Sequence, residues 1–279
     1  MSDSASQRHH KTPPPARPVD ERLRGLHLRL AENQAEIEAS QRLRYQVFVE
    51  EMGARPTAER AAAGREHDRF DAFCDHLLLF DTERDAVVGT YRFLRRSQAA
   101  AAGGFYTATE YDIDCLLAYP GEIMELGRSC VHRDYRTGMA MQLVWRGISA
   151  YVAYHKITLL FGCASLHGTD PDALSVHLSY LYHHHLGPPA LRPRALPARY
   201  TEMNRQPAES FDPRKAMQIL PPLIKGYLRV GAYMGEGAVV DEDFGTTDVC
   251  VVLKPDLVTE RYRRNLNRAR SGPAVDEPS

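Results

Sequence analysis

The sequence contains few of the features that mark secreted, metal-binding or membrane-spanning proteins. Its five cysteines are widely spaced and include no Cys-x-x-Cys pair, which argues against a disulfide framework and against a zinc cage. The longest apolar runs, such as residues 77–80 and 157–161, are far shorter than the roughly 20 residues that span a bilayer. The first 20 residues have no apolar secretory segment. We therefore expect a cytoplasmic protein.

An excess of charge of either sign is also lacking. The 279 residues include 35 Lys and Arg against 36 Asp and Glu, a net charge of −1, so nothing indicates a nucleic-acid partner. Charge is instead local. Residues 241–243 form a short acidic patch, and five arginines gather between residues 261 and 270. As a bare run of charge this arginine cluster favours a solvated helix face, and contact with an acidic carrier protein or with the anionic surface of the inner membrane is the alternative.

A hydrophobic content of 43% is typical of a globular domain. We expect this domain over residues 21–268, between disordered tails at residues 1–20 and 269–279. Apolar periodicity predicts helices at 18–37 (weakly), 39–52, 138–155, from Asp170 onward, and at 217–230 with a break at Pro221. Strands are expected at 75–81, 87–95, 122–131, 157–163 and 247–253, the last on the same sheet as the others.

One segment combines a strand, a basic turn and an amphipathic helix. Glu125-Leu-Gly-Arg-Ser-Cys-Val131 is followed by His132-Arg-Asp-Tyr-Arg-Thr-Gly-Met-Ala140, and a helix follows directly. The first amides of a helix have no partner within it, and the helix dipole is positive at this end, so the turn suits a phosphate. A phosphate-bearing donor and a charged acceptor are therefore expected to meet beside Glu125.

The residues of this turn resemble a known motif. Val131-x-x-x-Tyr135-Arg136 before an amphipathic helix is similar to the acyl-donor motif of the GNAT acyltransferases, whose turn amides hold the pyrophosphate or phosphopantetheine of a thioester. In this chain the glycine follows the arginine one residue earlier than usual. The resemblance implies that the acyl donor is bound by Val131, Arg133, Arg136 and Gly138. For either arginine alone, a solvated surface position is the alternative.

Two longer resemblances narrow the family. The acyl-homoserine-lactone synthases are matched in order by Arg44-Tyr-Gln-Val-Phe48, Glu66-His-Asp68-Arg-Phe-Asp71, Val88-Gly-Thr-Tyr-Arg92 and Glu125-Leu-Gly-Arg128. The ornithine-acyl-ACP N-acyltransferases, which make lyso-ornithine lipid in bacteria, are resembled further on by Phe161-Gly-Cys-Ala-Ser165, Gly168-Thr-Asp-Pro171, Arg194-Ala-Leu-Pro197, residues 220–229 and Phe244-Gly-Thr-Thr-Asp-Val249. The likeness covers about residues 36–266, and the long C-terminal extension (about 187–268) disfavours a lactone synthase.

These resemblances imply a fold and an activity. The expected fold is GNAT-like: an α/β domain with a twisted, mostly antiparallel sheet, flanked by helices and splayed at the strand that holds Glu125. The implied reaction moves a 3-hydroxyacyl group from acyl carrier protein to the α-amine of ornithine and forms lyso-ornithine lipid. The phosphopantetheine thioester is then a substrate, and no separate cofactor is expected.

Glu125 is the expected general base, because only a neutral amine can attack a thioester and the α-amine titrates at about 8 or above. Burial would have to raise the pKa of its carboxyl for this role. The alternative is a structural carboxylate that pairs with Arg92 or Arg128. Strict alternation along a strand puts Glu125 and Arg128 on opposite faces, so a β-bulge is expected between them.

An ornithine-like acceptor carries one carboxylate and two amines, so its pocket needs both a guanidinium and carboxylates. The expected acceptor-binding residues are three arginines, three acids and one aromatic: Arg44, Arg92, Arg128, Glu66, Asp68, Asp71 and Phe48. The alternative is an internal salt-bridge network that closes residues 60–71 over the sheet. The two roles can coexist.

Other candidates are weaker. Three adjacent histidines at 183–185 point in different directions on a helix, so we expect no metal site there. Ser129 and Cys130 have no base placed beside them beyond His132, so direct transfer is expected rather than a covalent enzyme intermediate. The alternatives for function are a lactone synthase, an acyltransferase for another amino acid or amine, and a non-catalytic module that binds carrier protein or membrane.

Overall fold

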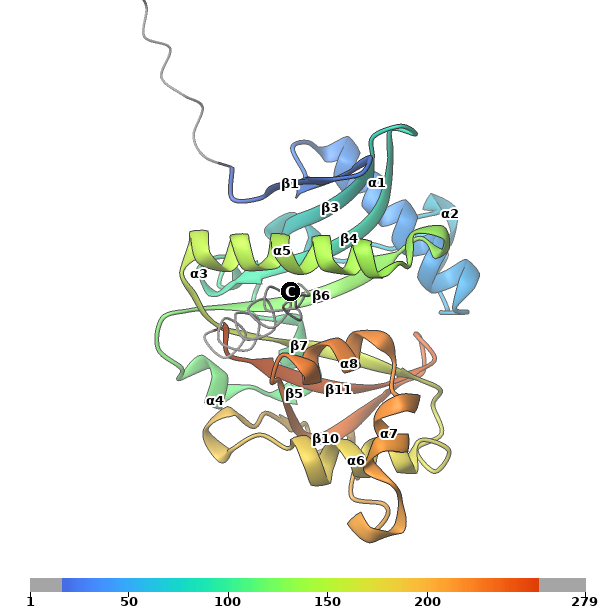
Figure 1. The fold of residues 1–279 in the computed structure, drawn as a ribbon, viewed down its shortest axis with the longest axis vertical. Coiled ribbons are helices and arrows are strands. Elements are labelled where there is room, and N and C mark those ends of the chain that lie inside the picture. The colour runs from blue at the N-terminus through green and yellow to red at the C-terminus, as the bar shows by residue number, and fades with distance from the viewer. Residues whose placement is uncertain (1–16, 256–279) are drawn as a thin grey trace, which may run out of the picture.

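A single large sheet forms the centre of the protein in the computed structural model, which describes residues 17–255. The strand order is β1-β2-β3-β4-β6-β7-β11-β10-β8-β5, with β9 on β10 (Figure 1). The strands are β1 (Asp20–Leu23), β2 (Leu26–Leu30), β3 (Asp75–Asp81), β4 (Ala86–Arg95), β5 (Tyr111–Asp112), β6 (Glu122–Val131), β7 (Ile157–His167), β8 (Arg194–Ala195), β9 (Tyr200–Thr201), β10 (Tyr233–Asp241) and β11 (Thr246–Leu253).

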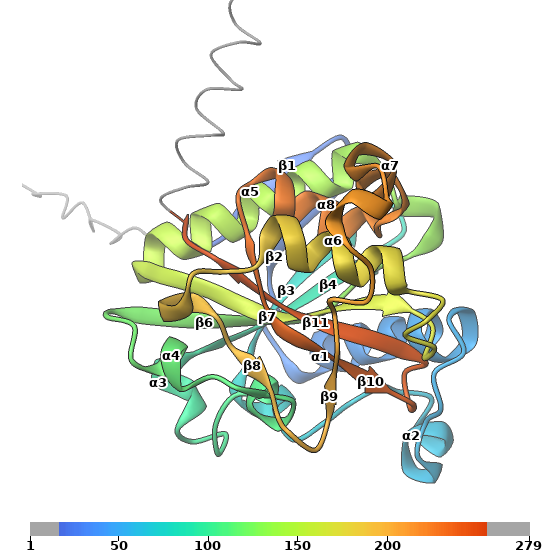
Figure 2. The same ribbon diagram turned by 90° about the horizontal axis from the view of Figure 1, so that it is seen from below.

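Helices cover both faces of this sheet. Figure 2 shows α5, α6, α7 and α8 on one face and α1, α3 and α4 on the other. The α-helices are α1 (Gln34–Arg44), α2 (Ala58–Ala63), α3 (Arg96–Ala99), α4 (Asp114–Leu117), α5 (Gly138–His155), α6 (Ser175–His185), α7 (Pro213–Ile219) and α8 (Pro222–Arg229). A π-helix, η1 (Tyr45–Glu51), continues α1, and the short 3-10 helices are η2 (Asp71–Phe73), η3 (Tyr106–Thr109), η4 (Arg133–Tyr135), η5 (Pro189–Leu191) and η6 (Ala208–Ser210).

The pairing of β6 with β7 opens part of the way along the two strands. They are parallel and pair from Glu122↔Ile157 to Glu125↔Phe161, where the ladder ends. A Cβ at Gly162 would lie 2.1 Å from the Leu126 carbonyl oxygen, so only glycine permits this close approach just before the strands separate. The predicted splay at the strand that holds Glu125 is confirmed, as is the mostly antiparallel sheet.

A β-bulge changes the direction of the side chains in the middle of β6. The register with β4 shifts directly after the Arg92↔Gly127 pair, and Arg128 has a φ of 51°. The bulge places the Arg128 guanidinium on the same side as that of Arg92, since both bind Asp68. A bulge is therefore present in this strand as predicted, but it lies at Arg128 and Ser129 rather than between Glu125 and Arg128.

The C-terminal strands complete the sheet. β11 pairs antiparallel with β7 from Thr246↔His167 to Leu253↔Leu160, and β10 pairs with the other edge of β11. The prediction that the C-terminal part joins the same sheet is therefore confirmed. The predicted break near Pro221 separates α7 from α8.

The predicted weak helix at 18–37 is wrong. Residues 20–30 form the β1–β2 hairpin, and its turn residues Arg24 and Gly25 both have positive φ (46° and 77°). Leu26, Leu28 and the intervening His27 pair with β3, which outweighs the helical preference of the Arg- and Glu-rich sequence. The tail predicted to end at residue 20 is also too long, because Val19 is buried.

Other boundaries also differ from the prediction. The first core helix begins at Gln34 rather than residue 39 and becomes a π-helix at Tyr45. Asp170 begins a turn instead of a helix, since its carboxylate accepts from the Asp172 amide (2.9 Å), and α6 starts at Ser175.

The arginines at 261–270 and most of both predicted tails lie outside the described residues. Within residues 17–255, each helix is too short or too polar to cross a membrane.

Candidate functional site

A cavity of about 720 Å³ lies where β6 and β7 separate. Its wall combines the predicted strand and turn with parts of the C-terminal extension, since α8 and β11 both contribute. The lining residues used below are Phe48, Arg92, Tyr106, Glu125, Leu126, Arg128, Val131, Arg136, Gly138, Leu223, Asp241, Phe244 and Asp248. The cavity therefore reaches from the N-terminus of α5 to the end of β10.

Glu125 lines this cavity but is only 5% exposed. Its carboxylate accepts hydrogen bonds from the Tyr106 amide (2.9 Å), the Thr107 amide (2.5 Å) and the Thr107 hydroxyl (2.5 Å). Burial raises the pKa of Glu125, and the hydrogen bonds from Thr107 and Tyr106 and the charge of Arg92 oppose this effect only in part. The carboxylate therefore holds η3 against β6, and its role as general base stays a prediction.

The predicted acceptor-binding charges lie together in one buried network, which we call the ion network. Arg44, which is 0% exposed, binds Glu66 through Nε (2.7 Å) and Asp71 through Nη2 (2.7 Å). Arg92 binds Asp71 at 2.9 Å. Burial acts to raise the pKa of Asp71, but Arg44 and Arg92 outweigh it and hold that pKa far below its usual value.

Asp68 links the remaining arginine to this ion network. Arg92 binds Asp68 at 2.6 Å, and Arg128 binds Asp68 and Glu66 at 3.2 Å each. Three arginines and three carboxylates therefore form a closed ring of ion pairs. This arrangement matches the second interpretation of these residues, an internal salt-bridge network that closes residues 60–71 over the sheet. Arg92 and Arg128 also line the cavity, and a role for them in binding the acceptor stays a prediction.

Phe48 and Phe244 form an aromatic edge of the cavity beside Arg128. Their rings meet edge to face at 5.9 Å, and the Arg128 guanidinium lies 5.1 Å from the centre of the Phe244 ring. The same guanidinium also lies 4.6 Å from the centre of the Tyr106 ring. Arg128 is therefore fixed between two aromatic rings as well as by two carboxylates.

The predicted donor turn leads into a helix N-terminus at the cavity. Thr137 caps α5, since its side chain accepts from the Ala140 amide at 3.2 Å, and the first helical residue is Gly138. Arg136 donates to the Val131 carbonyl (2.9 Å) and binds the Glu51 carboxylate (2.8 Å), so it holds the turn against η1.

The four predicted donor residues divide into two groups. Val131, Arg136 and Gly138 line the cavity, whereas Arg133 is exposed and lies outside its wall. A Cβ at Gly138 would meet no atom within 4 Å, so the glycine leaves open space at the helix N-terminus rather than relieving a clash.

Sequence reasoning missed several cavity residues. Tyr106 follows an Ala/Gly-rich loop and gave no signal, whereas Asp241 was noted only as part of a surface patch. Asp248 is a charged residue within the otherwise apolar strand Thr246–Leu253, and it is only 6% exposed. A single carboxylate in an apolar strand could therefore have indicated a buried functional residue. The histidines at 183–185 diverge as expected, since His183 contacts the Gln206 carbonyl and His185 the Tyr180 hydroxyl.

Comparison with known proteins places this geometry in a family. Residues 43–146 match the Acetyltransferase (GNAT) domain, which confirms the predicted fold class. FeeM, an N-acyl amino acid synthase from uncultured soil microbes, is a similar solved structure with a TM-score of 0.43 and 12% identity over 85% of this chain and 93% of its own.

Two relatives match over most of the chain. An L-ornithine N(alpha)-acyltransferase of Brucella abortus (strain 2308) is 47% identical over 248 residues, 86% of this chain and 88% of its own. Another of that name, from Agrobacterium fabrum (strain C58 / ATCC 33970), is 48% identical over 248 residues, 86% of this chain and 85% of its own. The chain therefore belongs to the L-ornithine N(alpha)-acyltransferase family.

Proposed function

We propose that this acyltransferase moves a 3-hydroxyacyl group from acyl carrier protein to the α-amine of ornithine and so forms lyso-ornithine lipid. The observation that carries the proposal is the 47–48% identity, over 86% of this chain, with two relatives named L-ornithine N(alpha)-acyltransferase. The cavity supports it, because one continuous space borders both a helix N-terminus suited to a phosphate and a cluster of buried charges suited to an amino acid.

The donor arm is proposed to enter beside α5. Its phosphate meets the first amides of α5 at Gly138, and the thioester lies along β6 beyond Glu125, where pairing with β7 has ended. Main-chain amides of β6 that face the opening then donate to the thioester carbonyl and stabilise the negative charge that develops on its oxygen. Apolar side chains of the wall, such as Leu126 and Leu223, suit the acyl chain.

The acceptor is proposed to enter from the side of β11. Arg128, fixed by its carboxylate and aromatic contacts, presents its charge toward the acceptor carboxylate. Glu125 then assists removal of the α-ammonium proton, for which the burial that raises its pKa is favourable. The neutral amine attacks the thioester carbon, the C–S bond breaks, and the thiol of the carrier protein leaves.

A reconstituted assay tests the proposal. The purified full chain is incubated with 3-hydroxyacyl carrier protein and ornithine, and the product is identified by mass spectrometry. Parallel reactions use the matching coenzyme A thioester, other amino acids and polyamines, and S-adenosylmethionine. We expect N-acyl-ornithine only in the carrier-protein reaction. A lactone product, a preferred acceptor other than ornithine, or the absence of any acyl transfer would overturn the proposal.

Membrane contact is a separate part of the proposal. The arginines at 261–270 that motivate it lie outside the described residues, so sequence alone supports it. Sedimentation with vesicles of anionic or neutral phospholipid tests it directly: binding only to the anionic vesicles is expected, and equal recovery with both would exclude an electrostatic contact.

A further inference from the structure

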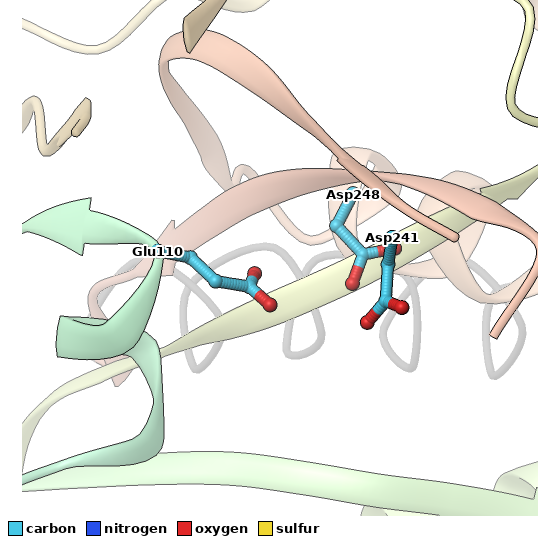
Figure 3. A group of neighbouring side chains, drawn as sticks. All are labelled: Glu110, Asp241 and Asp248. Carbon is cyan, nitrogen blue, oxygen red and sulfur yellow. The ribbon is translucent and has the colours of Figure 1, made fainter. Parts of the chain in front are cut away.

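Three carboxylates meet at the end of the cavity that is lined by β10 and β11. Glu110, Asp241 and Asp248 each place one carboxylate oxygen within 4.8 Å of the others (Figure 3). Asp241 and Asp248 line the cavity, and Glu110 points toward them from the end of η3. We call these three side chains the acidic cluster.

Glu110 is incompletely satisfied within the protein. The residue is 1% exposed, and its Oε2 has no hydrogen-bond partner among the described residues. Its Oε1 accepts from the Tyr106 hydroxyl (3.3 Å) and lies 3.6 Å from the half-buried guanidinium of Arg199. A buried carboxylate oxygen without a donor is unfavourable, so this oxygen indicates a ligand that donates hydrogen bonds.

The acidic cluster also lacks the balance of charge that the ion network has. In the ion network each carboxylate contacts two arginines. Here Glu110 forms an ion pair with Arg199, while burial, together with the carboxylates of Asp248 and Asp241, raises the pKa of Glu110. A ligand with positive charge would relieve this repulsion.

We propose that the acidic cluster binds the side-chain ammonium of the acceptor amino acid. The inference rests on the proposed function, in which that acceptor is ornithine. An ammonium offers three N–H donors, which suits three converging carboxylates. Tyr106 relates this site to the reaction centre, because its amide donates to Glu125 and its hydroxyl donates to Glu110. Tyr106 therefore links the two carboxylates by a hydrogen bond from each of its ends.

This arrangement explains how one of two amines is selected. Of the two amines of ornithine, the α-amine is the less basic and the side-chain amine resembles that of lysine. Carboxylates around the second amine keep it charged and therefore without a lone pair for attack. The α-amine, left beside Glu125, is then the only one able to lose its proton. The acidic cluster acts as a specificity determinant rather than as a catalytic group.

The test compares two acceptors that differ only in the side-chain amine, ornithine and 2-aminopentanoic acid. Initial rates with 3-hydroxyacyl carrier protein are measured for the wild type, for Glu110→Gln and for Asp241→Asn. We expect each variant to raise KM for ornithine by about tenfold to a hundredfold, with a smaller change in kcat and an unchanged KM for the donor. The preference for ornithine over 2-aminopentanoic acid should fall by the same factor.

Controls separate the possible outcomes. Glu242→Gln removes an exposed carboxylate next to the cluster and should leave all constants unchanged. Circular dichroism and calorimetric binding of ornithine to the donor-free protein establish that the variants are folded and report affinity without turnover. Folded variants that keep the wild-type preference overturn the inference while the proposed function stands. A wild type that does not acylate ornithine overturns the proposed function itself.

A metal ion is the competing occupant of three carboxylates. If turnover is lost in EDTA and restored by Mg²⁺ or Mn²⁺, and if the metal stabilises the wild type but not Glu110→Gln against heat, the cluster is a metal site and the ammonium assignment is wrong. Turnover that is insensitive to EDTA, with ornithine binding weakened in both variants, supports the ammonium.

Discussion

Removing the Glu110 carboxylate should stabilise the protein in a way that depends on pH. Burial, with Asp248 as the second cause, raises the pKa of Glu110 from 4.5 to about 7. As pH rises from about 4.5 to about 7, the unfolded state releases this proton while the folded state retains it, so the folded state is progressively disfavoured. Each pH unit corresponds to 1.36 kcal/mol, so the full effect is about 3 kcal/mol.

Glu110→Gln keeps the shape of the side chain and removes its titration. We therefore expect the variant to be more stable than the wild type by about 1 kcal/mol at pH 5 and by about 3 kcal/mol at pH 8. The other groups that face Glu110, namely Tyr106, Cys163, Arg199 and the two acids of the cluster, are present in both proteins.

Urea unfolding followed by circular dichroism at several pH values between 5 and 8 measures this difference, with extrapolation to zero denaturant. Glu242→Gln serves as the matched control, because it makes the same chemical change at an exposed position next to the cluster. A Glu110→Gln advantage that stays constant from pH 5 to pH 8, or that shrinks as pH rises, would refute the reasoning about burial.

Three further substitutions test other parts of the structure. Asp71→Asn leaves buried guanidinium groups short of a partner and should lower the free energy of unfolding by about 3–5 kcal/mol in urea; a change under about 1 kcal/mol would contradict a tight ion network. Glu125→Gln should lower kcat far more than donor affinity in steady-state kinetics, and unchanged turnover at saturating substrates would exclude Glu125 as base. Gly162→Ala places a Cβ 2.1 Å from the Leu126 carbonyl oxygen and should lower the free energy of unfolding by about 1–3 kcal/mol. Gly138→Ala is the control, because its Cβ would meet no atom within 4 Å. Equal melting temperatures for the two variants would argue against the close approach at Gly162.

The sequence was most informative where local signals agree with distant contacts. Strict alternation along residues 122–131 puts Glu125 and Arg128 on opposite faces, and the resemblance to a fold that has a bulge in this strand led to the prediction of a bulge. The charged residues of the ion network were found as a group, but their pattern does not distinguish pairing with one another from pairing with a substrate. That distinction depends on burial, which the sequence does not give. Arg44, for example, is 0% exposed and pairs with carboxylates of the protein itself.

The acidic cluster could not be predicted in this way. Glu110 and Asp248 are far apart in the chain and come together only because β11 lies beside β7 and η3 packs under β6. The β1–β2 hairpin was missed for a related reason. Its strands are short, and a local window does not detect the pairing of β1 with β2 and of β2 with β3 that orders them.

The position of β11 has a consequence for how the protein is made. This strand is the last described in the chain, yet it sits in the interior of the sheet, and β10, β8, β9 and β5 connect to β7 only through it. A nascent chain that ends before Thr246 would therefore lack β11 and, with it, the connection of four other strands to the sheet. It would also lack the part of the cavity wall that β11 supplies, so a ribosome-bound fragment is expected to begin acyl transfer only after β11 has been made.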